Sequence, residues 1–333
     1  MTKARFDVLG IGNAIVDVLA RTEDDFLVAE GLHKGSMNLI DTERAEYLYK
    51  LMGPAIEASG GSAGNTVFGL ASLGADTAFF GKVADDQLGE IFSHDMRSLG
   101  AHFDCAPLVG GVPTARSMIL ISPDGERTMN TYLGAATELS EADIDEDIVA
   151  NAAITYMEGY LWDKEKRQKK PSARRPAFRT KPGGRFPSAF RTASALIRFR
   201  EEFLDLLQTG QVDIVFANEP EVKALYQTAD RATALNALRA DTRLSAVTLG
   251  GEGSVAISGN ETFHVPACNV RELVDTTGAG DLYAAGFLYG ITHDMDLEKS
   301  ATLGNFCAAE VIQHIGPRPE HDMRQAAEQA GLL

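Results

Sequence analysis

The stretch that decides the fold of this 333-residue chain is Asp275–Asp281, Asp-Thr-Thr-Gly-Ala-Gly-Asp, which runs directly into the apolar stretch Leu282–Phe287. Small residues before an apolar helix leave the first backbone N–H groups of that helix accessible, and the helix dipole favours negative charge there. The loop is therefore expected to bind an anion such as a phosphate group. Asp281, in the first helical turn, is well placed to take a proton from a hydroxyl group that attacks the phosphate. The alternative is that Asp281 only caps the helix and the glycines only shape the turn.

Two common nucleotide-binding motifs do not match. A P-loop requires Gly-x-x-x-x-Gly-Lys-Ser/Thr, but Gly81-Lys82 is followed by Val83, and Asp76 stands where the first glycine should be. A dinucleotide-binding fingerprint could begin at Gly10-Ile11-Gly12, but its third glycine falls on Ile15. A nicotinamide-dependent oxidoreductase is therefore a weak alternative.

The composition is that of an ordinary globular protein, and the length allows one large α/β domain or two smaller ones. The chain has 31 basic and 47 acidic residues, a net charge of −16, which argues against a general nucleic-acid binder. It contains no apolar run long enough to span a membrane and no secretory signal, so we expect a cytoplasmic enzyme that acts on a small molecule. The three cysteines are widely spaced, which fits reduced, buried thiols rather than a disulfide framework or a metal site; they are Cys105, Cys268 and Cys307.

One segment, residues 164–200, departs from this composition. It holds thirteen basic residues and a single acid, Glu165, together with four prolines and the pair Gly183-Gly184. Neither a long helix nor a central strand passes easily through the middle of such a sequence. The segment is a nucleic-acid-binding or membrane-binding insert, a solvated basic loop, or the product of two compensating frameshifts. The abrupt change of composition at both ends favours the third interpretation.

The rest of the chain alternates short apolar runs with helical patterns, which predicts a layered α/β fold with a largely parallel sheet. Phe6–Ile11 is expected to be the first strand, and Gln87–Leu99 a helix that ends at Gly100. Two other regions, 14–40 and 105–135, carry strand-like runs that are expected to pair into a small sheet outside the main layer.

The stretch 275–287 closely resembles the C-terminal signature of the ribokinase-like (PfkB-type) sugar and nucleoside kinases. Gly60-Gly61-Ser62-Ala63-Gly64-Asn65-Thr66 resembles their N-terminal signature. The resemblance covers nearly the whole chain except about 164–200. It implies a single ribokinase-like domain over residues 1–333, with a three-layer α/β fold, a mostly parallel central sheet and a small β lid from about 14–40 and 105–135.

The resemblance also implies roles for individual residues. Asp281 would deprotonate the acceptor hydroxymethyl group, and the loop Gly278-Ala279-Gly280 would stabilise charge on the transferring phosphoryl group. The acceptor site would be formed by six residues: Asn13, Asp17, Gly60, Gly61, Asn65 and Arg127. An amide and a carboxylate after the first strand can hydrogen-bond the vicinal hydroxyls of a ribose, although an Asx turn is the alternative. Arg127 resembles the lid arginine of adenosine kinases, and a solvated surface arginine is the alternative.

The same resemblance places ATP and Mg²⁺ further along the chain. Asn218-Glu219-Pro220-Glu221 matches an Asn-x-x-Glu element in which Glu221 organises Mg²⁺ through water, although alone it marks a helix start. The ATP-binding residues would be Asn218, Thr248, Gly250, Gly253 and Asn305. The alternatives are a plain glycine turn at 248–253 and an Asn305 that bonds only to backbone. Asp275 and Thr277 would lie near the monovalent-cation site that many relatives have. The sequence does not decide whether this protein uses K⁺.

The spacing Asn13-x-x-x-Asp17 resembles adenosine kinases more than ribokinases and favours a ribonucleoside, with adenosine first. The alternatives are a kinase for a hexose or keto-sugar acid, which needs a Lys or Arg for an acidic acceptor, and a catalytically silent nucleotide-binding relative. If the residues of 164–200 stand as printed, one core strand and part of the substrate pocket are expected to be replaced. We expect no nucleic-acid or membrane partner, and either a monomer or a homodimer.

Overall fold

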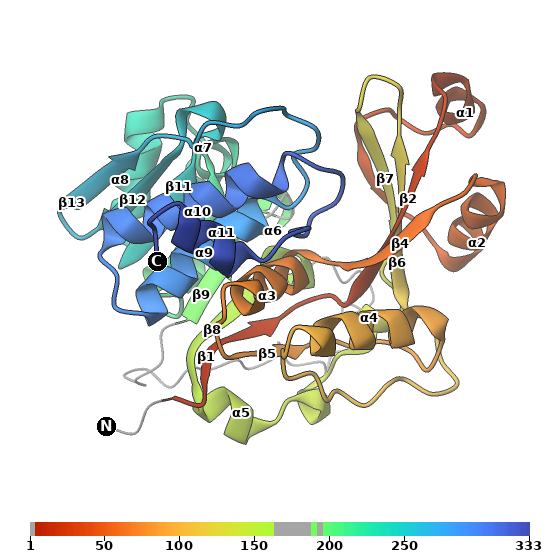
Figure 1. Ribbon diagram of the computed structural model, residues 1–333, viewed down its shortest axis with the longest axis horizontal. Coiled ribbons are helices and arrows are strands. Elements are labelled where there is room, and N and C mark those ends of the chain that lie inside the picture. Colours follow the sequence, from red (N-terminus) through yellow and green to blue (C-terminus); the bar gives the residue numbers. More distant parts are fainter. Residues whose placement is uncertain (1–3, 163–187, 192–195) are drawn as a thin grey trace.

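The computed structural model describes residues 4–162, 188–191 and 196–333, and arranges them around two β-sheets (Figure 1). The larger sheet has the strand order β13-β12-β11-β10-β9-β8-β1-β5. Its strands are β1 (Phe6–Ile11), β5 (Thr77–Phe80), β8 (Ala152–Glu158), β9 (Ser188–Arg191), β10 (Ile214–Asn218), β11 (Leu244–Thr248), β12 (Ser254–Ser258) and β13 (Glu261–Val265). The strands from β5 to β11 pair in parallel, and β12 and β13 add an antiparallel edge.

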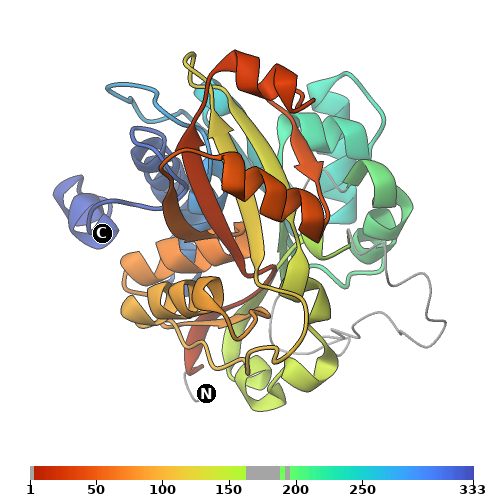
Figure 2. The ribbon, with the colours of Figure 1, turned by 90° about the vertical axis from the view of Figure 1, so that its right-hand side faces the viewer.

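Helices cover both faces of this sheet, so the predicted three-layer α/β fold is confirmed (Figure 2). On one side lie α3 (Ser62–Ser72), α9 (Ala279–Thr292), α10 (Leu297–Val311) and α11 (Met323–Gln329). On the other side lie α6 (Leu196–Gln208), α7 (Glu219–Leu225) and α8 (Arg231–Asp241). An aromatic pair lies in each interface between the sheet and a helix layer. Phe216 packs edge-on against Phe287 of α9 on one face, and Phe190 packs against Phe203 of α6 on the other.

The smaller sheet stands beside the larger one (Figure 1). Its strand order is β3-β7-β6-β2-β4, formed by β2 (Ile15–Arg21), β3 (Met37–Leu39), β4 (Ile56–Gly60), β6 (Ala115–Ile121) and β7 (Arg127–Tyr132). Four of these strands come from the two ranges expected for a small sheet, and β4 comes from outside them. Further helices are α1 (Asp24–Ala29), α2 (Thr42–Leu51), α4 (Gln87–Ser98) and α5 (Glu146–Ala150).

Helix α2 covers one face of the smaller sheet, where Ala45 packs with Met118 and Tyr132. Since side chains alternate along a strand, the opposite face carries Asp17 of β2 and its register partner Ser117 of β6. The two sheets are joined by short crossings, because β1 leads into β2 and β4 leads into α3. The face of the smaller sheet that carries Asp17 therefore adjoins the two connections to the larger sheet.

The anomalous segment contributes to the core, contrary to expectation. Ser188–Arg191 form β9, which is buried between β8 and β10, so this core strand is not replaced. The strand begins after Pro187, the last proline of the segment, and its backbone N–H groups are therefore available for the sheet. Residues 164–187 and 192–195, which include all four prolines of the segment, lie outside the described residues.

Other sequence expectations can be compared directly. Strand β1 has the predicted bounds, and α4 ends before Gly100, whose φ is +82°. All three cysteines are free, but Cys268 is only half-buried because it lies in the loop after β13, so the expectation of three buried thiols is wrong there. Among the described residues, no helix is both long and apolar enough to cross a lipid bilayer.

Candidate active site

The glycine-rich loop lies at the N-terminus of α9, as predicted. Gly278 is the residue before the helix and has a φ of +78°. A Cβ atom there would lie 2.7 Å from the backbone oxygen of Pro317, so a side chain would displace the loop that follows α10. The 14-residue helix directs its positive end at the space beside this loop. The arrangement is suited to holding a phosphate group.

Asp281 is not a helix cap. The residue is 5% exposed, and its side chain turns toward α3, where it accepts hydrogen bonds from Ser62 Oγ at 2.8 Å and Asn65 Nδ2 at 3.0 Å. The capping position belongs to Gly278 instead. The packing of α3 on α9 thus brings the two glycine-rich motifs, about 215 residues apart, to a single carboxylate.

Arg191, at the end of β9, forms an ion pair with this carboxylate. Its Nη1 also donates to Ser62 Oγ at 2.9 Å, and a Cβ at Gly280 would lie 2.5 Å from Nη2. The guanidinium therefore covers both Asp281 and the glycine-rich loop. Arg191 is one of thirteen basic residues in the anomalous segment, and no sequence motif distinguishes it from the others. Its side chain points toward α9 because Arg191 is the register partner of Phe216, whose side chain packs on α9.

The predicted acceptor residues come together where the two sheets meet. A Cβ at Gly60 would overlap the Asp17 carboxylate, and one at Gly61, where φ is +84°, would overlap the backbone oxygen of Asn13. Asp17 is buried, and burial raises its pKa to about 7, while the nearby guanidinium groups of Arg318 and Arg127 act in the opposite direction. These glycines allow the chain to pass close to the Asp17 carboxylate and to the Asn13 backbone.

Asn13 does not form an Asx turn with its side chain. Its Nδ2 donates to Glu158 Oε1 at 2.7 Å, and its backbone N–H donates to the same oxygen at 2.8 Å. Burial raises the pKa of Glu158, whereas its hydrogen bonds to Ala63 and Asn13 lower it. Glu158 ends β8, 145 residues from Asn13, and no local sequence pattern marks it as a partner of Asn13.

Arg127 is not a solvated surface arginine. It reaches from β7 to form an ion pair with Asp275, and the two side chains are 9% and 3% exposed. Asp275 also accepts hydrogen bonds from the backbone N–H groups of Thr277 and Gly316. Arg127 therefore connects the smaller sheet to the loop that precedes α9.

Four of the five predicted ATP-binding residues follow the carboxyl ends of β10 and β11, the end of the sheet where ligands bind in open α/β folds, and the fifth, Asn305, lies in α10. Asn218 and Glu221 form a reciprocal capping box at the start of α7. Thr248 ends β11, and Gly253, with a φ of +100°, closes the turn to β12. Asn305 donates to the backbone oxygens of Val265 and Pro266, so its amide nitrogen serves the backbone, as the plainer alternative expected.

Arg318 is a third residue, after Arg191 and Glu158, that sequence patterns do not single out. Its guanidinium packs over the Phe68 ring at 4.2 Å, and Nη2 lies 4.0 Å from Met96 Sδ. Nε and Nη1 are buried without a partner among the described residues, and burial lowers the pKa of Arg318 to about 10. It is a buried cation under the influence of the Asp95 and Asp17 carboxylates, and it has no sequence motif around it.

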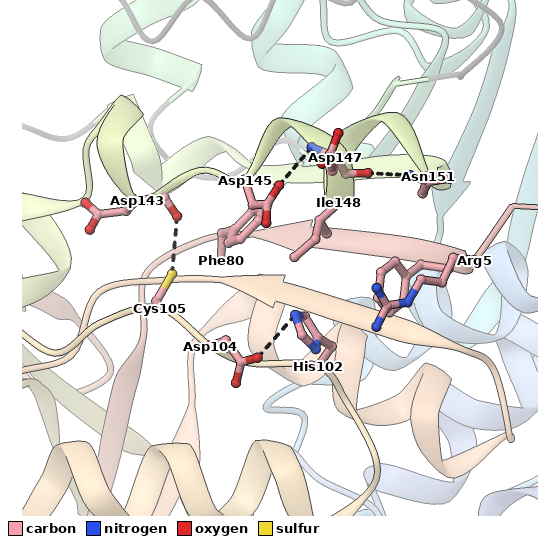
Figure 3. A pocket seen from close by; sticks show the side chains of 11 residues that line it. Arg5, Phe80, His102, Asp104, Cys105, Asp143, Asp145, Asp147, Ile148 and Asn151 are labelled. Carbon is pink, nitrogen blue, oxygen red and sulfur yellow. Dashed lines mark hydrogen bonds and ion pairs between the residues drawn. The ribbon is translucent and has the colours of Figure 1, made fainter.

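A separate cavity of about 370 Å³ lies at the other end of the sheet, near the starts of β1 and β8 (Figure 3). Its polar side chains are engaged with neighbours: His102 lies 3.5 Å from Asp104, Cys105 Sγ donates to the backbone oxygen of Asp143, and Lys82 pairs with the Asp143 carboxylate. None of the residues that line it belongs to the site around Asp281. This cavity is therefore not the candidate active site.

Comparison with known proteins shows the family of this chain and its fold. The pfkB family carbohydrate kinase model matches residues 39–323. The structure of adenosine kinase from Sinorhizobium meliloti is 53% identical with a TM-score of 0.90, covering 98% of this chain and 100% of that one. A "probable sugar kinase" from Rhizobium etli CFN 42 is 49% identical with a TM-score of 0.89, covering 99% and 100% of the two chains. Ribokinase from Thermotoga maritima, 17% identical with a TM-score of 0.71, covers 97% and 99% and shares the fold.

The family match spans most of the chain and includes both glycine-rich motifs. The Sinorhizobium meliloti and Rhizobium etli proteins each cover this chain almost completely, including the two sheets and the loop before α9. The chain therefore has the ribokinase-like fold and belongs to the pfkB family of carbohydrate kinases, phosphotransferases that act on an alcohol group of a sugar or nucleoside.

Proposed function

We propose that this protein transfers the γ-phosphoryl group of ATP to the primary hydroxyl of a nucleoside, with adenosine as the preferred acceptor. The observation that carries the proposal is the position of Asp281. Its carboxylate lies in the first turn of α9, beside the anion-binding loop, and is held by Ser62 and Asn65 of the opposing motif. A hydroxyl bound next to Asn65 would therefore stand between a base and a phosphoryl group.

In this mechanism Asp281 accepts the proton of the attacking hydroxyl. The backbone of Gly278, Ala279 and Gly280 and the positive end of α9 stabilise the charge that develops on the transferring group. Asn13 and Asp17 hold the sugar hydroxyls, and Gly60 and Gly61 let the sugar approach the backbone. Because the site lies between two sheets, movement of the smaller sheet as a lid would exclude water and limit hydrolysis of ATP.

ATP would lie along the ends of β10 and β11, near Asn218, Thr248, Gly250, Gly253 and Asn305. The described residues hold no cluster of three or more His, Cys, Asp or Glu that could bind a metal alone. This fits Mg²⁺, which commonly keeps several waters and binds through phosphates, with Glu221 acting through water. Mg²⁺ would neutralise charge on the phosphates. The Asp275 loop, closed by Gly316, is the proposed place for K⁺.

The smaller sheet favours a nucleoside over a bare sugar. On the face that carries Asp17, the neighbouring register positions are Leu19, Ile119 and Met129. Leu19 and Ile119 are 5% and 1% exposed, so they form a buried apolar lining next to the carboxylate proposed to bind the sugar. Such a lining suits a flat base, which gains from leaving water, whereas a sugar would bring only hydroxyls to it. The 53% identity to an adenosine kinase supports the same acceptor.

A second candidate is an acidic acceptor such as a sugar acid or sugar phosphate. The observation that favours it is Arg318, whose buried Nε and Nη1 have no partner among the described residues. A carboxylate or phosphate near Asp17 would supply that partner. Removing the charge with Arg318→Gln would then abolish use of an acidic acceptor and leave use of adenosine little changed.

The test is ADP release from Mg-ATP with adenosine, inosine, ribose, fructose and 2-keto-3-deoxygluconate as acceptors. We expect turnover with adenosine that is lost in Asp281→Asn. Turnover with only a sugar or a sugar acid would refute the nucleoside assignment and leave the phosphoryl-transfer mechanism in place. Binding of ATP and nucleoside without any ADP release would support the catalytically silent alternative.

A further inference from the structure

Glu158 joins three parts of the acceptor site through one buried carboxylate. It is the last residue of β8, and the residue is 1% exposed. Oε1 accepts from both the backbone and the side chain of Asn13, and Oε2 accepts from the backbone N–H of Ala63 at 2.7 Å. A carboxylate so deeply buried is costly unless donors surround it, and here three donors do.

This contact sets the direction of the Asn13 amide. Because an ionised carboxylate only accepts hydrogen bonds, the amide nitrogen of Asn13 must face Glu158. Within the described residues no group donates to Asn13 Oδ1, so the oxygen is the end left for a ligand. Gly12 keeps this arrangement possible, since a Cβ there would lie 2.7 Å from Glu158 Oε2.

Two neighbouring side chains present oxygen acceptors in the same way. Asn65 gives its Nδ2 to Asp281, and its Oδ1 is buried with no partner among the described residues. Asp17 supplies a carboxylate beside Gly60. A site that presents oxygen acceptors requires a ligand that donates hydrogen bonds, and each hydroxyl missing from the ligand leaves a buried acceptor unpaired.

We propose that Glu158 is a positioning residue: it turns the Asn13 amide so that its oxygen faces the acceptor, and thereby selects molecules with paired hydroxyl donors over their deoxy analogues. The proposal rests on the proposed function for the identity of the acceptor. The positioning itself follows from the contacts of Glu158 with Asn13 and Ala63.

The test compares Glu158→Gln with the parent chain, using adenosine, 2′-deoxyadenosine and 3′-deoxyadenosine. Gln keeps the shape but offers one acceptor oxygen and a competing NH₂ group. We expect the KM for adenosine to rise about 10- to 100-fold, the effect of losing a charge-assisted hydrogen bond. The KM for ATP should stay within about twofold, because Glu158 acts only on the acceptor side. The preference for adenosine over both deoxynucleosides should fall by a similar factor.

A matched control is Asp86→Asn, because Asp86 also accepts three hydrogen bonds, from Gly89 and twice from Thr114, away from the site. It should lower thermal stability without changing the preference for hydroxyls. In a double-mutant cycle, Asn13→Ala and Glu158→Gln should be strongly non-additive, because the second acts through the first.

The proposal is overturned if Glu158→Gln keeps the parent's preference for adenosine, or if both KM values rise together with a loss of stability like that of Asp86→Asn. Calorimetric binding of the three nucleosides in an Asp281→Asn background separates this result from the proposed function. Nucleoside binding that depends on Glu158, in a parent chain that releases no ADP, would refute the kinase proposal and support the positioning role. If the parent uses a sugar instead, that sugar and its deoxy analogue decide the role of Glu158.

Discussion

Replacing Arg191 with alanine should make the enzyme faster. In the structure the guanidinium pairs with Asp281, donates to Ser62 Oγ and covers Gly280. Asp281 must release this partner before it can accept a proton from the acceptor. A hydrogen bond to a charged group contributes about 1.5–3 kcal/mol, and the Arg191 side chain is only 24% exposed, so solvent screening is modest. Since about 1.4 kcal/mol is a factor of ten in rate, kcat should rise about 10- to 100-fold.

The assay is ADP release at saturating Mg-ATP and adenosine, with thermal unfolding of each variant as a check on folding. The control is Arg243→Ala, which removes an ion pair with Asp213 from an arginine that is 84% exposed and should leave kcat unchanged. The acceleration should also disappear in an Asp281→Asn background, because no base remains to be released. A kcat that is unchanged or lower in Arg191→Ala, with folding intact, would refute the reasoning and indicate that Arg191 assists phosphoryl transfer.

Three further predictions follow from other contacts. Binding of adenosine should weaken as pH falls below about 7, because the buried Asp17 carboxyl, with its pKa raised to about 7, takes up a proton and then accepts fewer hydrogen bonds from the sugar. Calorimetry with adenosine would detect this change, and Asp17→Asn should remove the pH dependence. Gly61→Ala should destabilise the fold by at least about 1 kcal/mol in thermal unfolding and raise the acceptor KM, since φ is +84° and the new Cβ would overlap the Asn13 backbone oxygen. The control is Gly259→Ala, where φ is +53° but no atom lies close to the new Cβ, so only the backbone strain should lower stability. If compensating frameshifts produced residues 164–200, redetermining the nucleotide sequence should restore an acidic, amphipathic composition there; an unchanged sequence would reject that interpretation.

Local sequence patterns predict much of this fold. Strand β1 is a continuous apolar run, and the end of α4 is marked by Gly100, which adopts the left-handed conformation that glycine favours. Strand β4 has no such signal, because Ile56 is 66% exposed and the strand ends in glycine. Strand β9 is hidden by the basic, proline-rich sequence around it, and its place depends on pairing with β8 and β10.

The same division holds for the candidate site. The glycine-rich motifs place Asp281, Gly278 and the Gly60-Gly61 pair, because their spacing reflects local backbone requirements. Glu158 and Arg191 are positioned by strand register and by contacts with residues 95 to 145 positions away in the sequence. No local pattern therefore identifies them. Arg318 lies in the loop after α10 and reaches the site only because that loop packs against α3 and α4.

The central claim is that Asp281 is the general base for phosphoryl transfer, and single-turnover transfer from Mg-ATP to adenosine tests it most directly. Asn at position 281 keeps the size of the side chain but cannot accept the proton. We predict that Asp281→Asn lowers the transfer rate by about 10²- to 10⁴-fold, the usual contribution of a general base, while binding of ATP and adenosine is largely retained. A transfer rate in Asp281→Asn equal to that of the parent chain would contradict the account.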